Sequence, residues 1–128
     1  LPKLISIVKN KSINKSINYR DGKDHFTLLH RCTLTQGDPI QIVDMLLEYN
    51  AMIDLEDLQG RTPLHLCASR GNESLLNHLL KKGANTMAKT KDNQTPLHLA
   101  AEAGHINCVK SLVENHVLVN LQDVEGFT

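Results

Sequence analysis

Apolar positions in the middle of the chain recur at the spacing of two short helices. One stripe has gaps of one, three and four residues, which places its members on one face of a helix: Leu75, Leu76, Leu79 and Leu80. Upstream of it, Leu64, Leu66 and Ala68 predict a shorter helix with small and aliphatic residues turned inward. Gly71 separates the two helices, and Asn72 can cap the second one. The pattern therefore predicts a pair of helices joined by a tight turn.

This pattern repeats along the chain. The sequence Thr62-Pro63-Leu64-His65-Leu66 recurs as Thr95-Pro96-Leu97-His98-Leu99, an offset of 33 residues, and a degenerate copy, Thr27-Leu28-Leu29-His30, lies 35 residues before the first. A further copy opens at Glu125-Gly126-Phe127-Thr128. The threonine hydroxyl can cap the following helix, and proline suits the first helical position because an N–H there has no partner within the helix. One helix pair cannot bury its own faces, whereas stacked pairs can, so the repeat predicts a solenoid.

These copies resemble the ankyrin-repeat family over nearly the whole chain. The resemblance rests on Asp57-x-x-Gly60-x-Thr62-Pro63-Leu64-His65, and on Gly104-His105 followed by an apolar helix. It implies an all-α solenoid of stacked antiparallel helix pairs with β-hairpin-like finger loops. We expect a single domain, cut from a longer array, whose parts are a partial repeat or cap (1–21), an irregular repeat (22–56), two repeats (57–89 and 90–122) and the start of another (123–128).

Two repeats depart from the pattern. The irregular repeat has Leu28 in place of the motif proline and two extra residues between its helices. It therefore predicts a longer loop, in which Asp38 and Pro39 form the cap and first turn of the second helix. In the repeat over 90–122, Asn93 replaces the turn glycine and still tolerates a left-handed backbone.

Charge and cysteine content limit the class of protein. The formal charge is zero, from 14 basic and 14 acidic residues, which gives no support to nucleic-acid binding by the chain as a whole. Residues 1–31 nevertheless hold seven basic residues against two acidic ones. A solvated polar stretch is the favoured interpretation, and an anionic-partner patch is the alternative. No apolar run is long enough for a membrane span. Three cysteines without framework spacing favour a reducing, intracellular setting, cytoplasmic or nuclear.

The histidines and cysteines do not form a convincing chemical site. His30 and Cys32, like His65 and Cys67, are two residues apart in a predicted helix and so point to different sides. The resemblance implies that the motif histidines bond the backbone between adjacent loops. Cys108 takes the place of Leu75 on the apolar stripe, which predicts a buried, unreactive thiol. We expect no catalytic residue, metal site, cofactor or small-molecule substrate.

The resemblance implies that a partner protein binds the concave face, which is formed by the fingers and the first helix of each repeat. The repeat offset gives the finger positions as Lys23, Asp24, Phe26, Leu58, Gln59, Arg61, Lys91, Asp92, Gln94, Val124, Glu125 and Phe127. The first helices add Ser69, Arg70, Glu102 and Ala103. Aromatic and arginine side chains dominate interface energetics. We therefore expect Phe26, Leu58, Arg61 and Phe127 to contribute affinity, unless the two phenylalanines fold back over neighbouring loops.

Function at this level remains a choice among classes. The leading hypothesis is a protein-interaction module or scaffold. The alternatives are a docking or regulatory arm of a larger enzyme, channel or transferase, and an inhibitor-type transcriptional regulator. Direct nucleic-acid binding is the weakest of them. The resemblance also makes Asn120 a candidate for asparaginyl hydroxylation, because Leu112 lies eight residues before it; a plain turn asparagine is the simpler interpretation.

Overall fold

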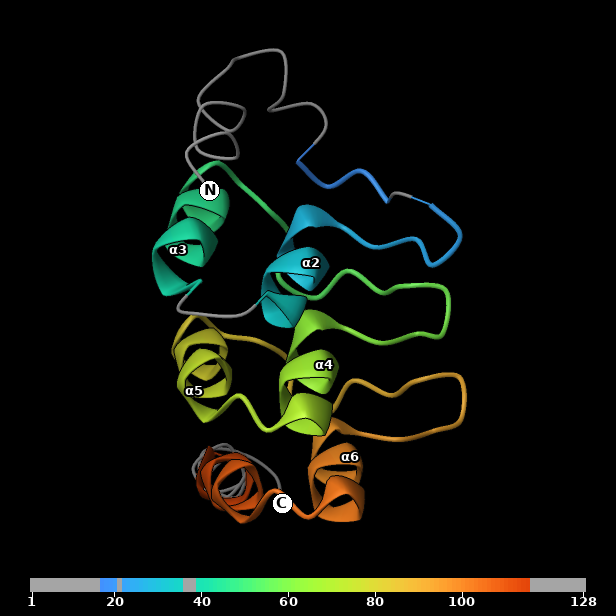
Figure 1. The fold of residues 1–128 in the computed structure, drawn as a ribbon, viewed down its shortest axis with the longest axis vertical. Coiled ribbons are helices and arrows are strands. Elements are labelled where there is room, and N and C mark those ends of the chain that lie inside the picture. Colours follow the sequence, from blue (N-terminus) through green and yellow to red (C-terminus); the bar gives the residue numbers. More distant parts are fainter. Residues whose placement is uncertain (1–16, 21, 36–38, 116–128) are drawn as a thin grey trace, which may run out of the picture.

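The computed structural model describes residues 17–20, 22–35 and 39–115. These residues fold into helix pairs stacked along one axis (Figure 1). The pairs are α2 (Leu28–Leu34) with α3 (Ile40–Glu48), α4 (Pro63–Arg70) with α5 (Glu73–Lys81), and α6 (Pro96–Ala103) with a helix over 106–115. The first helices form one layer and the second helices another, while the finger loops project on the far side of the first layer (Figure 1). The predicted all-α solenoid is confirmed.

Each first helix begins at a threonine of the repeated motif. The hydroxyl oxygens of Thr27, Thr62 and Thr95 accept the N–H of the motif histidine at 3.3, 3.4 and 3.3 Å. The histidine Nδ1 in turn accepts the backbone N–H of that threonine. Two N–H groups that have no partner within the helix are thereby satisfied at every start. The same local sequence therefore sets the same helix start in every described repeat.

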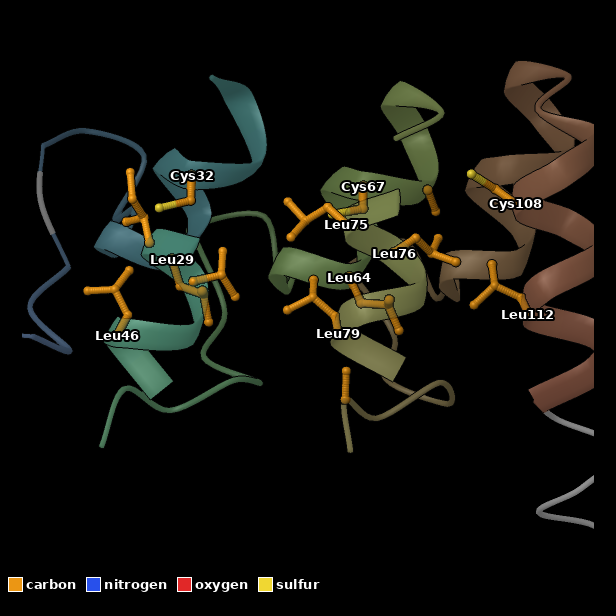
Figure 2. Close-up of a cluster of buried hydrophobic side chains, with 14 of the residues drawn as sticks. Leu29, Cys32, Leu46, Leu64, Cys67, Leu75, Leu76, Leu79, Cys108 and Leu112 are labelled. Carbon is orange, nitrogen blue, oxygen red and sulfur yellow. The ribbon is translucent and has the colours of Figure 1, made fainter. Parts of the chain in front are cut away.

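Leucines fill the space between the two layers. Figure 2 shows Leu64, Leu75, Leu76 and Leu79 converging there, and all four are 0% exposed. The thiols of Cys32, Cys67 and Cys108 lie in the same core. Burial raises the pKa of the Cys32 thiol to about 11 and also raises the pKa values of the other two. All three cysteines therefore remain neutral thiols, as the place of Cys108 on the apolar stripe predicted for that residue.

Hydrogen bonds at equivalent positions join each repeat to the next. In the fingers, the Leu58 N–H donates to the Asp24 carbonyl at 2.8 Å, and the Lys91 N–H donates to the Gln59 carbonyl at 3.0 Å. In the turns after the second helices, Asn18 Oδ1 accepts the Met52 N–H at 2.7 Å. One repeat later, Asp54 Oδ1 accepts the Asn85 N–H at 3.0 Å. The fingers therefore stack with a fixed register, as expected of a solenoid stabilised by neighbour contacts.

Polar side chains also connect α3 with α5 and its C-cap. His78 Nε2 on α5 lies 2.6 Å from Asp44 Oδ1 on α3, and Lys82 Nζ lies 3.7 Å from the same oxygen. The hydrogen bond from His78 lowers the pKa of the Asp44 carboxyl. Because the carboxylate is well exposed, such a pair contributes less than about 1 kcal/mol.

The irregular repeat has the longer loop that its sequence predicted. Residues 35–39 separate α2 from α3, whereas only residues 71–72 separate α4 from α5. The predicted first turn is wrong by one residue, because Pro39 is the N-cap of α3 and its carbonyl accepts the Val43 N–H at 2.9 Å. Asp38 lies outside the described residues. Asn93 adopts the expected left-handed backbone, with φ of 62°.

The repeat boundaries derived from the offset remain a prediction, since most of 1–21 and all of 123–128 lie outside the described residues. Within the part of the chain that is described, no helix has the length and apolar character that crossing a membrane requires.

Candidate protein-binding face

A buried carboxylate holds the finger before α4. Asp57 Oδ1 accepts the backbone N–H groups of Gln59 and Arg61 at 2.9 and 2.8 Å, and Oδ2 accepts Arg61 Nε–H at 2.8 Å. The Asp57 side chain is 0% exposed. The Asp57 N–H also donates to the Arg61 carbonyl at 2.9 Å, which closes the finger across its base. Asp57 therefore fixes both the backbone of this finger and the direction of its arginine.

The next finger uses a threonine for the same purpose. Thr90 Oγ1 accepts the N–H groups of Asp92 and Gln94, both at 3.2 Å, and the Thr90 N–H donates to the Gln94 carbonyl at 3.0 Å. Thr90 stands 33 residues after Asp57. Short oxygen-bearing side chains that bond backbone N–H groups a few residues ahead are typical of turns. The sequence indicates only a turn at this place, and the alignment of Asp57 with Thr90 is the signal from which a clamp could have been predicted.

The motif histidines join each first helix to the following finger. His30 Nε2 lies 2.8 Å from the Arg61 carbonyl oxygen, and His65 Nε2 lies 3.0 Å from that of Gln94. A carbonyl oxygen only accepts, so Nε2 carries the ring proton. Nδ1 is left to accept from the threonine hydroxyl at 2.9 Å. The expected bonds to adjacent loops are confirmed for His30 and His65.

These bonds give the two buried histidines a structural role. Both rings are 0% exposed, and burial lowers the pKa of each below its ordinary value. Each ring has both nitrogens engaged in a neutral form, which leaves no lone pair for a metal or for proton transfer. Among the residues placed by the structure, no three histidine, cysteine or acidic side chains gather as a metal site would require.

Acidification below about pH 6.5 is expected to lower the free energy of unfolding. An unfolded histidine titrates near pH 6.5. Below that pH, the unfolded chain binds protons that the buried rings of His30 and His65 do not bind in the folded protein. The stability that these rings contribute is therefore fully present above about pH 6.5 and is lost as the pH falls towards their lowered pKa values. Urea unfolding across this range measures the slope. His65→Gln should reduce the slope of the free energy of unfolding against pH. His98→Gln, at a histidine whose ring is exposed, is the matched control. Equal slopes in the two variants would contradict the expectation.

The residues predicted to bind a partner lie on successive fingers and first helices (Figure 1). Those that the structure describes form the surface called here the binding face: Lys23, Asp24, Phe26, Leu58, Gln59, Arg61, Ser69, Arg70, Lys91, Asp92, Gln94, Glu102 and Ala103. Phe26, Arg61 and Gln94 are half-buried, and the others are exposed. Leu58 is 43% exposed although it is apolar. Asn120, Val124, Glu125 and Phe127 lie outside the described residues, and their roles stay predictions.

Phe26 packs against its own repeat. Its ring stacks on His30 with centroids 5.5 Å apart and planes within 7°. The Arg31 guanidinium carbon lies 5.8 Å from the same ring centroid. Part of the ring is therefore covered by neighbouring side chains, which limits the area that it can offer to a partner.

Comparison with known proteins places this arrangement in a family. The family model for ankyrin repeats (3 copies) matches residues 3–90 and 29–123. A putative ankyrin repeat protein of fowlpox virus (strain NVSL), FPV244, is 31% identical over 117 residues, which cover 91% of this chain and 16% of that protein. The inhibitor of Bruton tyrosine kinase from Homo sapiens is 38% identical over 98 residues, which cover 74% of this chain and 7% of that protein.

A plant enzyme carries a similar segment. The ADP-ribosylation factor GTPase-activating protein AGD2 of Arabidopsis thaliana is 39% identical over 74 residues, which cover 58% of this chain and 9% of that protein. The chain thus spans no more than 16% of the length of these relatives. The stacked helix pairs, the histidine bonds between repeats and the match over most of the sequence agree, and the chain belongs to the ankyrin-repeat family.

Proposed function

We propose that this chain is a protein-interaction module that holds a partner protein on the binding face. Ankyrin repeats are in general protein–protein interaction modules. The observation that carries the proposal for this chain is the exposed Leu58 on a finger whose backbone is fixed on both sides. The N–H of Leu58 is bonded to the preceding finger, and the carbonyl of Gln59 is bonded to the following one. Because the backbone that carries this apolar side chain is already ordered, a partner that covers it does not have to order the finger on binding.

The surrounding residues support a polar rim around this apolar group. Gln59, Ser69, Arg70, Lys91 and Asp92 are exposed. Interfaces commonly combine a small apolar or aromatic anchor with a polar, solvated rim. The motif histidines His30, His65 and His98 are bonded to the backbone and the three cysteines are buried thiols, so the proposal includes no catalytic role for this segment. We propose an intracellular setting, cytoplasmic or nuclear, for a protein with three free cysteines.

A second candidate function is a docking or regulatory arm of a larger protein. The relatives supply the observation that favours it, because the matched segment is a small share of each of them. One is named as a GTPase-activating protein, and another, from Danio rerio, as a palmitoyltransferase. In this candidate the binding face does the same work, and only the remainder of the protein differs. An inhibitor-type transcriptional regulator remains a further alternative.

The double substitution Leu58→Ala and Arg61→Ala is expected to weaken binding to the natural partner by at least about ten-fold, since truncation of central anchors typically costs more than about 1 kcal/mol. The partner is first obtained by affinity capture with the full-length protein and mass spectrometry, and its affinity is then measured by calorimetry.

Val113→Ala combined with Lys81→Ala is the matched control. Val113 is 42% exposed, which is similar to the exposed fraction of Leu58. Unlike Leu58, Val113 lies on a second helix, as does Lys81. The control should bind like the unmodified protein, and circular dichroism should show that both variants are folded. Unchanged affinity in the finger variant would show that the binding face is wrongly assigned.

A further inference from the structure

We propose that Arg61 is a preset receptor for a carboxylate, so that the binding face recognises an acidic segment of its partner protein. This inference rests on the proposed function and specifies the chemistry of the partner.

Hydrogen bonds hold both the backbone and the side chain of Arg61. Its N–H and its Nε–H both donate to Asp57, each at 2.8 Å. Its carbonyl accepts from the Asp57 N–H at 2.9 Å and from His30 Nε2 at 2.8 Å. Backbone and side chain are thus held from two repeats at once. The rotamer freedom that an exposed arginine normally loses on binding is already restricted in the free protein.

These bonds leave the terminal N–H groups of the Arg61 guanidinium available to a partner. A guanidinium has five N–H donors, and Nε–H uses one of them. The two terminal nitrogens make no hydrogen bond to any residue that the structure describes, and the Arg61 side chain is 36% exposed. Their planar pair of N–H groups matches a carboxylate, which accepts two parallel hydrogen bonds. Asp57 cannot bind these terminal N–H groups, because its carboxylate is 0% exposed and already accepts three other N–H groups.

The charge of the binding face is more positive around Arg61 than in the following repeat. In the first two described repeats, the charges at the binding face are Lys23, Arg61 and Arg70 against Asp24 and the buried Asp57 that pairs with Arg61, an excess of one positive charge. In the following repeat they are Lys91 against Asp92 and Glu102, an excess of one negative charge. Glu102 is also occupied, because its Oε2 accepts Gln94 Nε2–H at 3.0 Å. The face therefore favours an acidic group over Arg61 rather than over the later finger.

Leu58 supplies the other half of the recognition. It lies on the same finger as Arg61 and is 43% exposed. A partner segment that presents an Asp or Glu carboxylate to Arg61 can place a nearby apolar side chain on Leu58. The occupant is therefore an acidic protein segment with an adjacent apolar residue.

The test uses a displayed library of random peptides, about 16 residues long, selected on the whole immobilised protein. The length is chosen because an extended chain of this size can span several fingers. The enriched peptides are synthesised, and their affinities are measured by fluorescence anisotropy. We expect selected peptides to be rich in Asp and Glu. Arg61→Lys, which keeps the charge and removes the fork, should weaken binding by about ten-fold or more. Arg20→Lys, at an exposed arginine outside the binding face, is the matched control and should change affinity less than about three-fold.

A substitution in the peptide tests whether its carboxylate contacts Arg61 directly. Changing its critical acidic residue to the corresponding amide should make the affinities for the unmodified protein and Arg61→Lys equal, which is the signature of a direct pair in a double-mutant cycle. Thermal unfolding of Arg61→Lys verifies that the finger is still folded.

The other outcomes separate the two proposals. Peptides without acidic residues that lose affinity on Leu58→Ala would overturn the carboxylate receptor while supporting the binding face. Peptides insensitive to both Leu58→Ala and Arg61→Lys would overturn both proposals. Failure to enrich any peptide would overturn the receptor, and capture of the natural partner would then decide the binding face independently. A single-stranded DNA oligonucleotide that displaced the peptides, with a steep loss of affinity in salt, would also overturn the acidic protein segment as the occupant.

Discussion

Replacing His65 with alanine is expected to lower the free energy of unfolding by about 3 kcal/mol, because several buried groups lose their partners at once. The Thr62 hydroxyl and N–H lose the Nδ1 acceptor, which lies 2.9 and 3.0 Å away. The Gln94 carbonyl loses the Nε2–H donor at 3.0 Å. The ring is 0% exposed, so its removal also leaves a cavity. Urea denaturation followed by circular dichroism measures the change.

His98→Ala is the matched control for this prediction. His98 makes the same hydrogen bonds to Thr95, at 2.9 and 3.1 Å, but its ring is exposed. Its removal should cost about 1 kcal/mol, the usual value for a weakened helix cap. If the two variants were equally stable, burial and the bond to the next finger would contribute nothing. His65→Gln, which retains a donor and an acceptor, should recover part of the loss.

Replacing Gly60 with alanine is expected to destabilise the protein by about 2–5 kcal/mol and to disturb the finger register. Gly60 has φ of 79°, and a left-handed backbone costs an alanine about 1–2 kcal/mol. The added Cβ would also lie 2.9 Å from the Lys91 backbone nitrogen and 3.2 Å from Thr90 backbone atoms. These atoms belong to the next finger and are held by its own bonds, so overcrowding adds about 1–3 kcal/mol. Thermal and urea unfolding measure the total.

Gly83→Ala separates the two causes. Gly83 has φ of 89°, and a Cβ there would meet no atom within 4 Å. It should therefore lose only the conformational part, about 1–2 kcal/mol. The difference between the two variants reports the contact between fingers. Gly60→Ala should also weaken the bond from the Lys91 N–H to the Gln59 carbonyl, visible as faster exchange of that amide proton. Equal losses at the two glycines would mean that the fingers do not pack as closely as described.

Much of the backbone could be predicted from the sequence. The motif threonines, the apolar stripes and the turn glycines are local features that act within a few residues, and they recur at an offset of 33. They determine where helices start and which faces are buried. The histidine bonds between repeats were implied by the resemblance to the ankyrin-repeat family, not by these local features. The irregular loop is where local signals were weakest, and there the first turn of α3 was misplaced by one residue.

The side chains of the binding face could not be predicted in the same way. Phe26, Arg61 and Gln94 occupy the same repeat position, yet each finds a different partner. Phe26 stacks on His30, Arg61 bonds to Asp57 in its own finger, and Gln94 reaches Glu102 on the following helix. Sequence periodicity marked all three as finger residues. It did not show which of them keeps donors free for a partner.

The physical reason is the range of the interactions. Helix starts, helix ends and buried stripes depend on neighbours within one or two turns, so the sequence by itself determined the solenoid and its family. The direction of a long side chain depends on which group lies within hydrogen-bond or van der Waals reach after the repeats have stacked. Only the tertiary structure decided that Arg61 is clamped by a buried carboxylate and that Leu58 stays exposed beside it.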